Sequence, residues 1–240
     1  MRLLSNILFP VGTTDSCRFA ASFLARSGFL VTDHPSPDVT HLLLDVPGLP
    51  SELRELLRML PGTVTVIGYG LDADFLKSHP KLDLKNDAQF LARNAAITAE
   101  CALQAAAPHL TTTLWDSPTL ILGWGRIGKC LGKLLREIGT PVTVAARKAS
   151  DRAMAEALGY RSVDFSGIEE EVTRHRVLFN TVPEGITLTK SSPGCVKIDL
   201  ASLPGLQGSD IIPARGLPGK YAPESAGKLI AERVCQFRKE

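Results

Sequence analysis

The chain has 240 residues, of which 44% are hydrophobic, 22% charged and 6% aromatic. This composition excludes a disordered chain, a collagen-like chain and a disulfide-dense miniprotein, and it predicts a soluble globular protein with an aliphatic core. The 27 Lys and Arg residues nearly balance the 25 Asp and Glu residues, which gives a formal net charge of +2. Binding to nucleic acid or to an anionic membrane is therefore not expected.

No apolar run approaches the roughly 18 residues that a membrane span needs, and Met1–Pro10 lacks the apolar core of a signal peptide. The 5 cysteines and 5 histidines are scattered, without metal-ligand spacing. An odd number of isolated cysteines is typical of reduced thiols in the cytosol. We therefore expect a cytoplasmic protein without a metal site.

The first half of the chain alternates short apolar runs with amphipathic stretches. Strands are expected at Asn6–Val11, Phe29–Thr32, His41–Val46 and Thr63–Gly68, and helices at Asp15–Arg26 and from Ser51 to Leu60. Such alternation predicts a parallel sheet covered by helices. An Ala-rich helix over Asp87–Ala107 follows, and its small side chains suit a connector between two domains.

The second half of the chain repeats this strand–helix rhythm. Strands are expected at Thr119–Leu122, Val142–Ala145, Val177–Asn180 and Val196–Leu200, and helices at Ile127–Ile138, Asp151–Leu158, Ile168–Thr173 and about Glu224–Phe237. The pattern predicts an α/β protein with a doubly wound sheet.

The strongest local signal is a G-x-G-x-x-G pattern at Gly123, Gly125 and Gly128, between an apolar strand and an amphipathic helix. The first glycine permits a tight turn, the second lets a pyrophosphate approach the backbone, and the third lets the helix pack on the strand. The helix N-terminus then offers N–H groups to phosphates. A turn without a ligand fits this context less well. The expected contacts are Gly123, Trp124, Gly125, Arg126, Ile127 and Gly128.

These observations predict a domain organisation. A shortened N-terminal α/β domain spans residues 1–108, including the connecting helix 87–108. A Rossmann-type dinucleotide-binding domain spans residues 109–222. The last segment, 223–240, forms a helix that packs back toward the N-terminal domain.

The residues after the second strand of this domain favour NADP over NAD. A NAD-preferring site usually carries an Asp or Glu about 20 residues beyond the glycines, whereas this chain has Arg147 and Lys148 there. Arg147 suits stacking on adenine and pairing with a 2′-phosphate, and Lys148 and Ser150 add contacts. A solvated basic turn is the alternative.

Ligands of open α/β sheets lie beyond the carboxyl ends of the strands. Two later strands run into the turn-rich segments Asn180–Pro183 and Asp199–Gly205. On the connecting helix, Asn94 and Thr98 are four residues apart and share a face, with Glu100 nearby. The sequence therefore predicts a cleft lined by backbone donors, an amide and small hydroxyls.

These motifs, in this order, resemble the A-subunit family of dipicolinate synthase. The resemblance covers about residues 87–234 and rests on Asn94…Thr98-Ala99-Glu100, the G-x-G-R-x-G turn, Asn180-Thr181-x-Pro183, Ile198–Ser202, Gly216–Gly219 and Ala222-Pro223…Ala226-Gly227. It implies an architecture similar to D-2-hydroxyacid dehydrogenases and oxidation of dihydrodipicolinate to dipicolinate with NADP during sporulation. It also implies the flavoprotein-like B-subunit of that synthase as partner, and we expect a homo-oligomer.

The chain departs from the family pattern in three ways. Its region before the connecting helix is shorter. Leu203 and Glu224 stand where the family has lysines, in loops expected to face a dicarboxylate substrate. Lys220 and Arg215 are the cations that would compensate for them.

The predicted site has a substrate side and a cofactor side. Asn94, Thr98, Ser202 and Lys220 are expected to line the substrate, with Glu100 as a possible base, although an exposed helical Glu or a buried partner of an Arg is the alternative. The later cofactor contacts are expected at Asn180, Thr181, Pro183, Asp199 and Leu200, and Asp199 has the alternative role of holding loop amides.

Two other functions stay open. The first is a 2-hydroxyacid dehydrogenase that acts on another substrate. It is disfavoured, because such an enzyme needs a His late in the chain as its acid–base group, and no His follows His175. A non-catalytic protein that binds NADP or serves as a scaffold, and that acts with a flavoprotein partner, is the other alternative.

Overall fold

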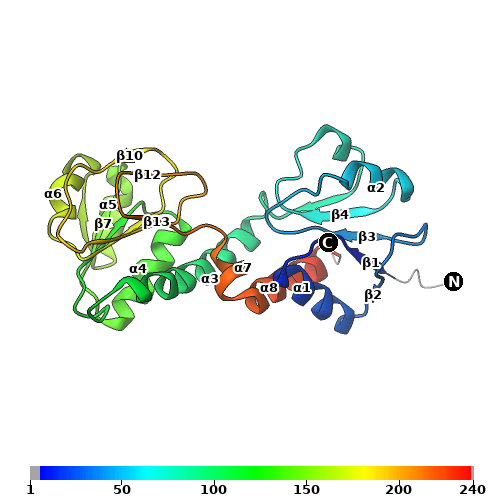
Figure 1. Ribbon diagram of the computed structural model, residues 1–240, viewed down its shortest axis with the longest axis horizontal. Coiled ribbons are helices and arrows are strands. Elements are labelled where there is room, and N and C mark those ends of the chain that lie inside the picture. The colour runs from blue at the N-terminus through cyan, green and yellow to red at the C-terminus, as the bar shows by residue number, and fades with distance from the viewer. Residues whose placement is uncertain (1–5, 239–240) are drawn as a thin grey trace. The chain divides into compact units, whose positions relative to one another are not determined.

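The computed structural model describes residues 6–238, and Figure 1 shows their helices and strands. The chain divides into two compact units. One comprises the residues up to Asn94 together with those from Pro218 onward, and the other comprises Ala95–Leu217. Among the described residues, no helix has the length and apolar character required to cross a membrane.

The N-terminal unit contains a five-stranded, fully parallel sheet in the order β2-β1-β3-β4-β5. This is the strand order of flavodoxin-like doubly wound folds. The aliphatic core packs between the sheet and α2, with Leu42, Leu53 and Val66 fully buried. The strands are β1 (Ile7–Pro10), β2 (Leu30–Val31), β3 (His41–Leu43), β4 (Thr65–Gly68) and β5 (Lys81–Asp83), and the helices of this unit are α1 (Asp15–Arg26), α2 (Leu53–Met59), α8 (Pro223–Phe237) and the 3-10 turn η1 (Asp74–Leu76).

The C-terminal helix α8 lies beside α1, as Figure 1 shows in red and blue. Gly227 makes this close approach possible. A Cβ at this position would lie 2.6 Å from the Phe19 Cβ, 2.6 Å from the Ser16 carbonyl oxygen and 2.8 Å from the Ala20 nitrogen. Residues far apart in sequence therefore complete the N-terminal unit.

Thr14 caps the N-terminus of α1, because its hydroxyl accepts a hydrogen bond from the Cys17 amide at 3.3 Å, and Asp45 binds the residues just before the helix. The Asp45 carboxylate, which follows β3, accepts hydrogen bonds from the backbone amides of Thr13 (3.0 Å) and Thr14 (3.1 Å) and from the Thr14 hydroxyl (2.6 Å). Gly12 leaves room for it, because a Cβ there would lie 2.4 Å from Asp45 Oδ1. The carboxylate therefore lies beside the N-terminus of α1, where the helix dipole favours negative charge.

The second unit contains a six-stranded, fully parallel sheet in the order β13-β11-β9-β6-β7-β8. Counted from β6, this is the dinucleotide-binding order 3-2-1-4-5-6, and the predicted α/β doubly wound fold is confirmed. Its strands are β6 (Thr119–Leu122), β7 (Val142–Ala145), β8 (Arg161–Val163), β9 (Val177–Asn180), β11 (Val196–Asp199) and β13 (Ile211–Pro213), beside a two-stranded pair of β10 (Ile186–Thr187) and β12 (Leu206–Gln207).

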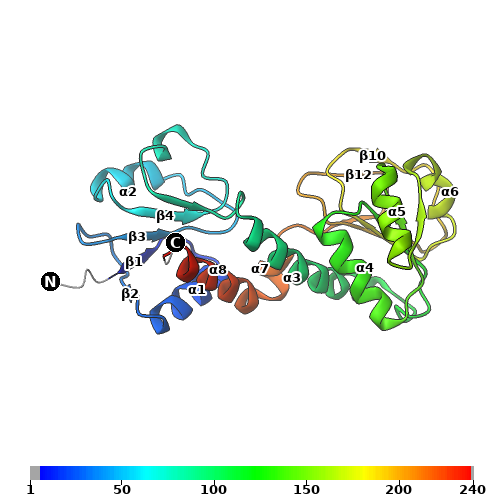
Figure 2. The same cartoon turned by 180° about the vertical axis from the view of Figure 1, so that it is seen from behind.

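Helices cover both faces of this sheet, so its central strands are buried. All residues of β6, β9 and β11 are buried, and Figure 2 shows α4, α5 and α6 around the sheet. The helical segments of this unit are α4 (Arg126–Ile138), α5 (Ala149–Ala157) and α6 (Ile168–Val172), with the 3-10 turns η2 (Ala107–His109) and η3 (Phe165–Gly167).

Two helices run across the boundary between the units, α3 (Ala88–Ala106) and the short α7 (Leu217–Tyr221). Asp87 precedes α3 and accepts a hydrogen bond from the Phe90 amide at 2.8 Å and another from Arg233 of α8. Burial raises the pKa of the Asp87 carboxyl, but these two donors outweigh it and hold the pKa below its ordinary value. The start of α3 is thereby fixed to α8 by a buried ion pair.

The sequence did not predict the three-residue strands β5, β8 and β13. Segments of three residues are too short to show an alternation of apolar and polar residues. Each of these strands is defined by its hydrogen bonds to the neighbouring strand of the sheet. Arg161 pairs in register with Thr143, and Ile211 pairs with Lys197.

Candidate functional site

The carboxyl ends of six parallel strands form one edge of the second sheet. In the register of the sheet, Val163, Ala145, Leu122, Asn180, Asp199 and Pro213 lie side by side at this edge. The loops after β6, β7, β9 and β11 therefore meet there. These loops carry most of the residues that the sequence predicts for the cofactor.

The glycine turn after β6 has the conformation that its three glycines predict. Gly123 has a φ of +96°, and a Cβ there would lie 2.4 Å from the Thr181 hydroxyl. A Cβ at Gly128 would lie 2.3 Å from the Gly123 carbonyl oxygen. A Cβ at Gly125, in contrast, would meet no atom within 4 Å. Two glycines thus permit close packing, and the middle one borders open space.

Gly125 is also the N-cap residue of α4, and its position provides no side-chain cap for the helix. The first N–H groups of α4 therefore adjoin the open space at Gly125, which is the arrangement that binds pyrophosphate in dinucleotide-binding folds. Arg126 at the first helical position is exposed, and Ile127 is half-buried. The turn consequently fits a phosphate group held by backbone donors.

The Trp124 side chain in this turn faces the protein core. It is 5% exposed, stands edge-to-face on Tyr160 with 5.1 Å between ring centroids, and lies 3.1 Å from the position of a Gly132 Cβ. Its buried Nε1 has no hydrogen-bond partner. The buried indole therefore packs against the core and stabilises the turn. Only the backbone of Trp124 is left to contact a ligand in the loop.

Three polar residues follow β7, and all are exposed: Arg147, Lys148 and Ser150. Lys148 precedes the first residue of α5. Arg147 pairs with Glu184, in the loop after β9. The sequence analysis did not predict a role for Glu184. The available signal was its position, because this acidic residue directly follows the Asn180–Pro183 motif of the predicted cofactor loop.

Asp199 connects the loops after β9 and β11. Its carboxylate accepts hydrogen bonds from the Asn180 amide (2.8 Å), the Gly205 backbone (2.9 Å) and the Arg215 guanidinium (2.8 Å). The Asn180 amide also bonds both the carbonyl oxygen and the backbone nitrogen of Val182. These buried groups fix the path of the two loops.

The other predicted residues of these loops are placed as follows. Thr181 donates its backbone N–H and its hydroxyl to the Leu122 carbonyl oxygen, each at 2.9 Å, and so joins the loop to β6. Pro183 and Ser202 are exposed, whereas Leu200 is buried. The structure therefore brings the cofactor-side residues together at one sheet edge.

The predicted substrate-side residues belong to both units. Asn94 and Lys220 lie in the N-terminal unit, whereas Thr98, Glu100 and Ser202 lie in the second. On α3, Asn94 is half-buried, Thr98 is 9% exposed and Glu100 faces solvent. A shared site for these five residues stays a prediction.

His175 lies at the other end of the sheet, just before β9 begins. It is buried, with Nδ1 2.6 Å from the Glu171 carbonyl oxygen and Nε2 3.0 Å from the Thr143 hydroxyl. Two hydrogen bonds from Arg161 lower the pKa of the Glu171 carboxyl. This cluster is part of the packing at the amino edge of the sheet, opposite the glycine turn.

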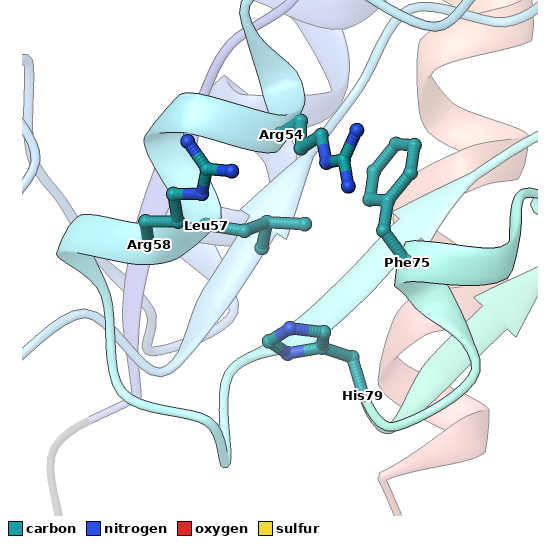
Figure 3. A pocket seen from close by; sticks show the side chains of 5 residues that line it. All are labelled: Arg54, Leu57, Arg58, Phe75 and His79. Atoms are coloured by element: carbon teal, nitrogen blue, oxygen red, sulfur yellow. The ribbon is translucent and has the colours of Figure 1, made fainter.

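A pocket of about 180 Å³ lies within the N-terminal unit, between α2 and the segment around η1 (Figure 3). Its lining is Arg54, Leu57, Arg58, Phe75 and His79. The volume is below the roughly 300–1,000 Å³ of most ligand sites, and Arg58 already donates two hydrogen bonds to Glu55. None of the predicted site residues lines it. We assign no ligand to this pocket.

Fold and glycine turn together define a Rossmann-type α/β protein of the kind found in dehydrogenases. In agreement, L-alanine dehydrogenase superposes on 89% of the chain and 75% of its own length with a TM-score of 0.67, at 14% sequence identity. At this identity the similarity concerns the fold. No protein-family model matches the sequence.

The particular resemblance that the motifs predicted is confirmed. The chain is 30% identical over 159 residues to the A-subunit of dipicolinate synthase from Bacillus subtilis (strain 168), and the match covers 61% of this chain and 54% of that protein. The match thus spans about half the length of the relative. The crystal structure of the dipicolinate synthase A-subunit from Bacillus halodurans has a TM-score of 0.81, 20% identity, and coverage of 98% of this chain and 99% of its own.

Proposed function

We propose that the chain binds NADP at the carboxyl edge of the second sheet and uses it to oxidise dihydrodipicolinate to dipicolinate. The observation that carries the proposal is the open space at Gly125, beside the uncapped N-terminus of α4, in a sheet with the dinucleotide-binding strand order. The similarity to the dipicolinate synthase A-subunit supports the substrate class. The same similarity supports a role in sporulation, which we propose with it.

A dihydropyridine dicarboxylate loses one hydride and one proton when it becomes aromatic. When bound, the nicotinamide ring supplies the hydride acceptor. Because aromatisation supplies driving force, the protein has mainly to orient the substrate, screen its carboxylates and exclude water. We assign orientation of the substrate to Asn94, Thr98 and Ser202, and release of the proton to solvent, because Glu100 is exposed and lies about 200° around α3 from Thr98.

The carboxylates of the substrate require cations. Leu203, in the loop after β11, is 63% exposed where the family has a lysine, so another cation has to serve. Arg215 follows β13 and is oriented by its bond to Asp199, and Lys220 is exposed on α7. We assign the carboxylates to these two side chains.

The binding part of the proposal is tested by Gly125→Ala. Its φ of −81° suits alanine, and a Cβ there meets nothing in the protein, so the unfolding midpoint should stay unchanged. The methyl group would occupy the space of the pyrophosphate, and we expect the Kd for NADPH to rise at least about tenfold. Gly167→Ala is the matched control, because its Cβ also meets no atom within 4 Å and its NADPH affinity should be unchanged.

The catalytic part is tested by turnover. Purified chain is mixed with dihydrodipicolinate and NADP, with and without the flavoprotein-like partner, and NADPH formation is followed. Substrate-dependent reduction supports the enzyme. Tight NADPH binding with no reduction under either condition would contradict it. That outcome would favour a non-catalytic NADP-binding protein, the second candidate function, which the exposed Leu203 supports.

A further inference from the structure

Arg147 and Glu184 form an ion pair between the loops after β7 and β9. The Arg147 Nη1 lies 2.5 Å from the Glu184 Oε2, and the guanidinium also lies over the Phe165 ring, 5.4 Å from its centroid. The hydrogen bond raises the pKa of Arg147 and lowers that of Glu184. The two side chains are 51% and 63% exposed, so the pair is accessible from solvent.

The position of this pair distinguishes it from an ordinary surface contact. Strands β7 and β9 flank β6 on its two sides, about 10 Å apart at the usual strand spacing. The pair therefore extends across the line of β6, where the glycine turn begins. In doubly wound folds the ligand binds outside the carboxyl ends of the strands, where the strand order reverses, and here that point lies between β6 and β9.

We propose that Glu184 sets the cofactor preference of this chain by occupying Arg147, the guanidinium assigned to the 2′-phosphate of NADP. The inference rests on the proposed function, because it assumes an adenine nucleotide at this sheet edge. Without its carboxylate the chain would select NADP over NAD more strongly. The ligand chemistry concerned is a phosphate monoester on the 2′-oxygen of adenosine.

The negative charge of Glu184 is expected to weaken the binding of a 2′-phosphate. A 2′-phosphate must replace the carboxylate on Arg147, and breaking an exposed ion pair lowers affinity by a factor of about 1.5 to 5. The displaced carboxylate remains on the neighbouring loop, where it repels the phosphate dianion and lowers affinity further. A ligand with an unmodified 2′-hydroxyl meets neither cost. Glu184 therefore narrows the difference in affinity between NADP and NAD.

The experiment uses two probes that differ only in the 2′-phosphate, adenosine 2′,5′-bisphosphate and 5′-AMP. Their Kd values are measured by calorimetry on the whole chain and on Glu184→Gln, which keeps the shape and removes the charge. We expect the bisphosphate to bind about tenfold more tightly to the variant and 5′-AMP to change by less than about twofold. The gain should shrink from ~0.1 M to ~1 M salt, because the added ions shorten the range of the repulsion.

Glu137→Gln is the matched control. Glu137 is an exposed acid in the last turn of α4, far from the glycine turn at the first, and its removal changes the net charge equally. Its bisphosphate affinity should stay within about twofold of the original. A gain as large as that of Glu184→Gln would overturn the inference, because it would show a general charge effect.

The remaining outcomes separate the inference from the proposed function. If the unaltered chain binds neither probe and no NADPH, the nucleotide site itself is refuted. If the probes bind but their affinity ratio is the same in Glu184→Gln, the inference fails and the proposed function stands. Weaker binding of 5′-AMP to the variant would also overturn the inference, because Glu184 would then be accepting the ribose hydroxyls.

Discussion

At the scale of single residues, the buried Asp199 shapes the site through the loops that it holds. The sequence left open whether this carboxylate contacts a ligand or holds loop amides. Its bonds to the Asn180 side-chain amide and the Gly205 backbone N–H are those that the second role predicts, and Arg215 pairs with the same carboxylate. One consequence is that Arg215 has a fixed orientation at the sheet edge, which suits a side chain assigned to a substrate carboxylate.

Cys17 provides a residue-scale prediction about reactivity. Burial, and next the Asp45 carboxylate, raise the pKa of the Cys17 thiol to about 12. At pH 8 about one molecule in 10⁴ then carries the reactive thiolate. We expect native protein treated with iodoacetamide to remain unmodified at Cys17 when peptides are analysed by mass spectrometry, and to label there after unfolding in guanidinium.

Cys130 and Cys235 provide the internal comparison, since both are half-buried. They should be modified before Cys17 in the same native sample. Equal labelling rates for Cys17 and Cys130 at pH 8 would show that α1 opens readily, and would contradict the tight packing described for it.

At the scale of elements, the crossing of α1 and α8 depends on Gly227. On an open helix surface, Gly→Ala stabilises by about 1 kcal/mol. At Gly227 the added Cβ would approach two backbone atoms and the Phe19 Cβ at 2.8 Å or less, and overpacking of this kind costs about 1–3 kcal/mol. We expect Gly227→Ala to lower the free energy of unfolding in guanidinium titrations.

Gly219→Ala is a control on α7 in the same unit. A Cβ there would meet the Ser16 hydroxyl at 3.6 Å, which is ordinary contact, so this variant should be neutral or slightly stabilised. If Gly227→Ala were stabilised as well, the close crossing of the two helices would be disproved.

Local sequence pattern determines some parts of this fold, whereas others depend on residues far away in the chain. The glycine turn was predictable because three residues within six positions specify its geometry. The Arg147–Glu184 and Asp199–Arg215 pairs were not, because their members are 37 and 16 positions apart and meet only through strand order. The strands β5, β8 and β13 were missed for a similar reason, since pairing with a neighbour defines them.

At the scale of the whole molecule, the chain builds two doubly wound units from different strand orders. The N-terminal unit is discontinuous, because α8 from the end of the chain packs on α1 near its beginning. Folding of that unit therefore requires contacts between residues separated by about the whole length of the chain, which we expect to form late.

The Asp45 carboxylate beside α1 affects how many nucleotides one chain can bind. Asp45 already binds the backbone N–H groups of Thr13 and Thr14 before α1. A phosphate that binds to these groups would have to displace a carboxylate of the same chain, whose effective concentration is in the millimolar range or above. The glycine turn of the second unit has no such competitor at Gly125. We expect calorimetric titration with NADPH to saturate at one equivalent per chain, and two equivalents would contradict this difference between the units.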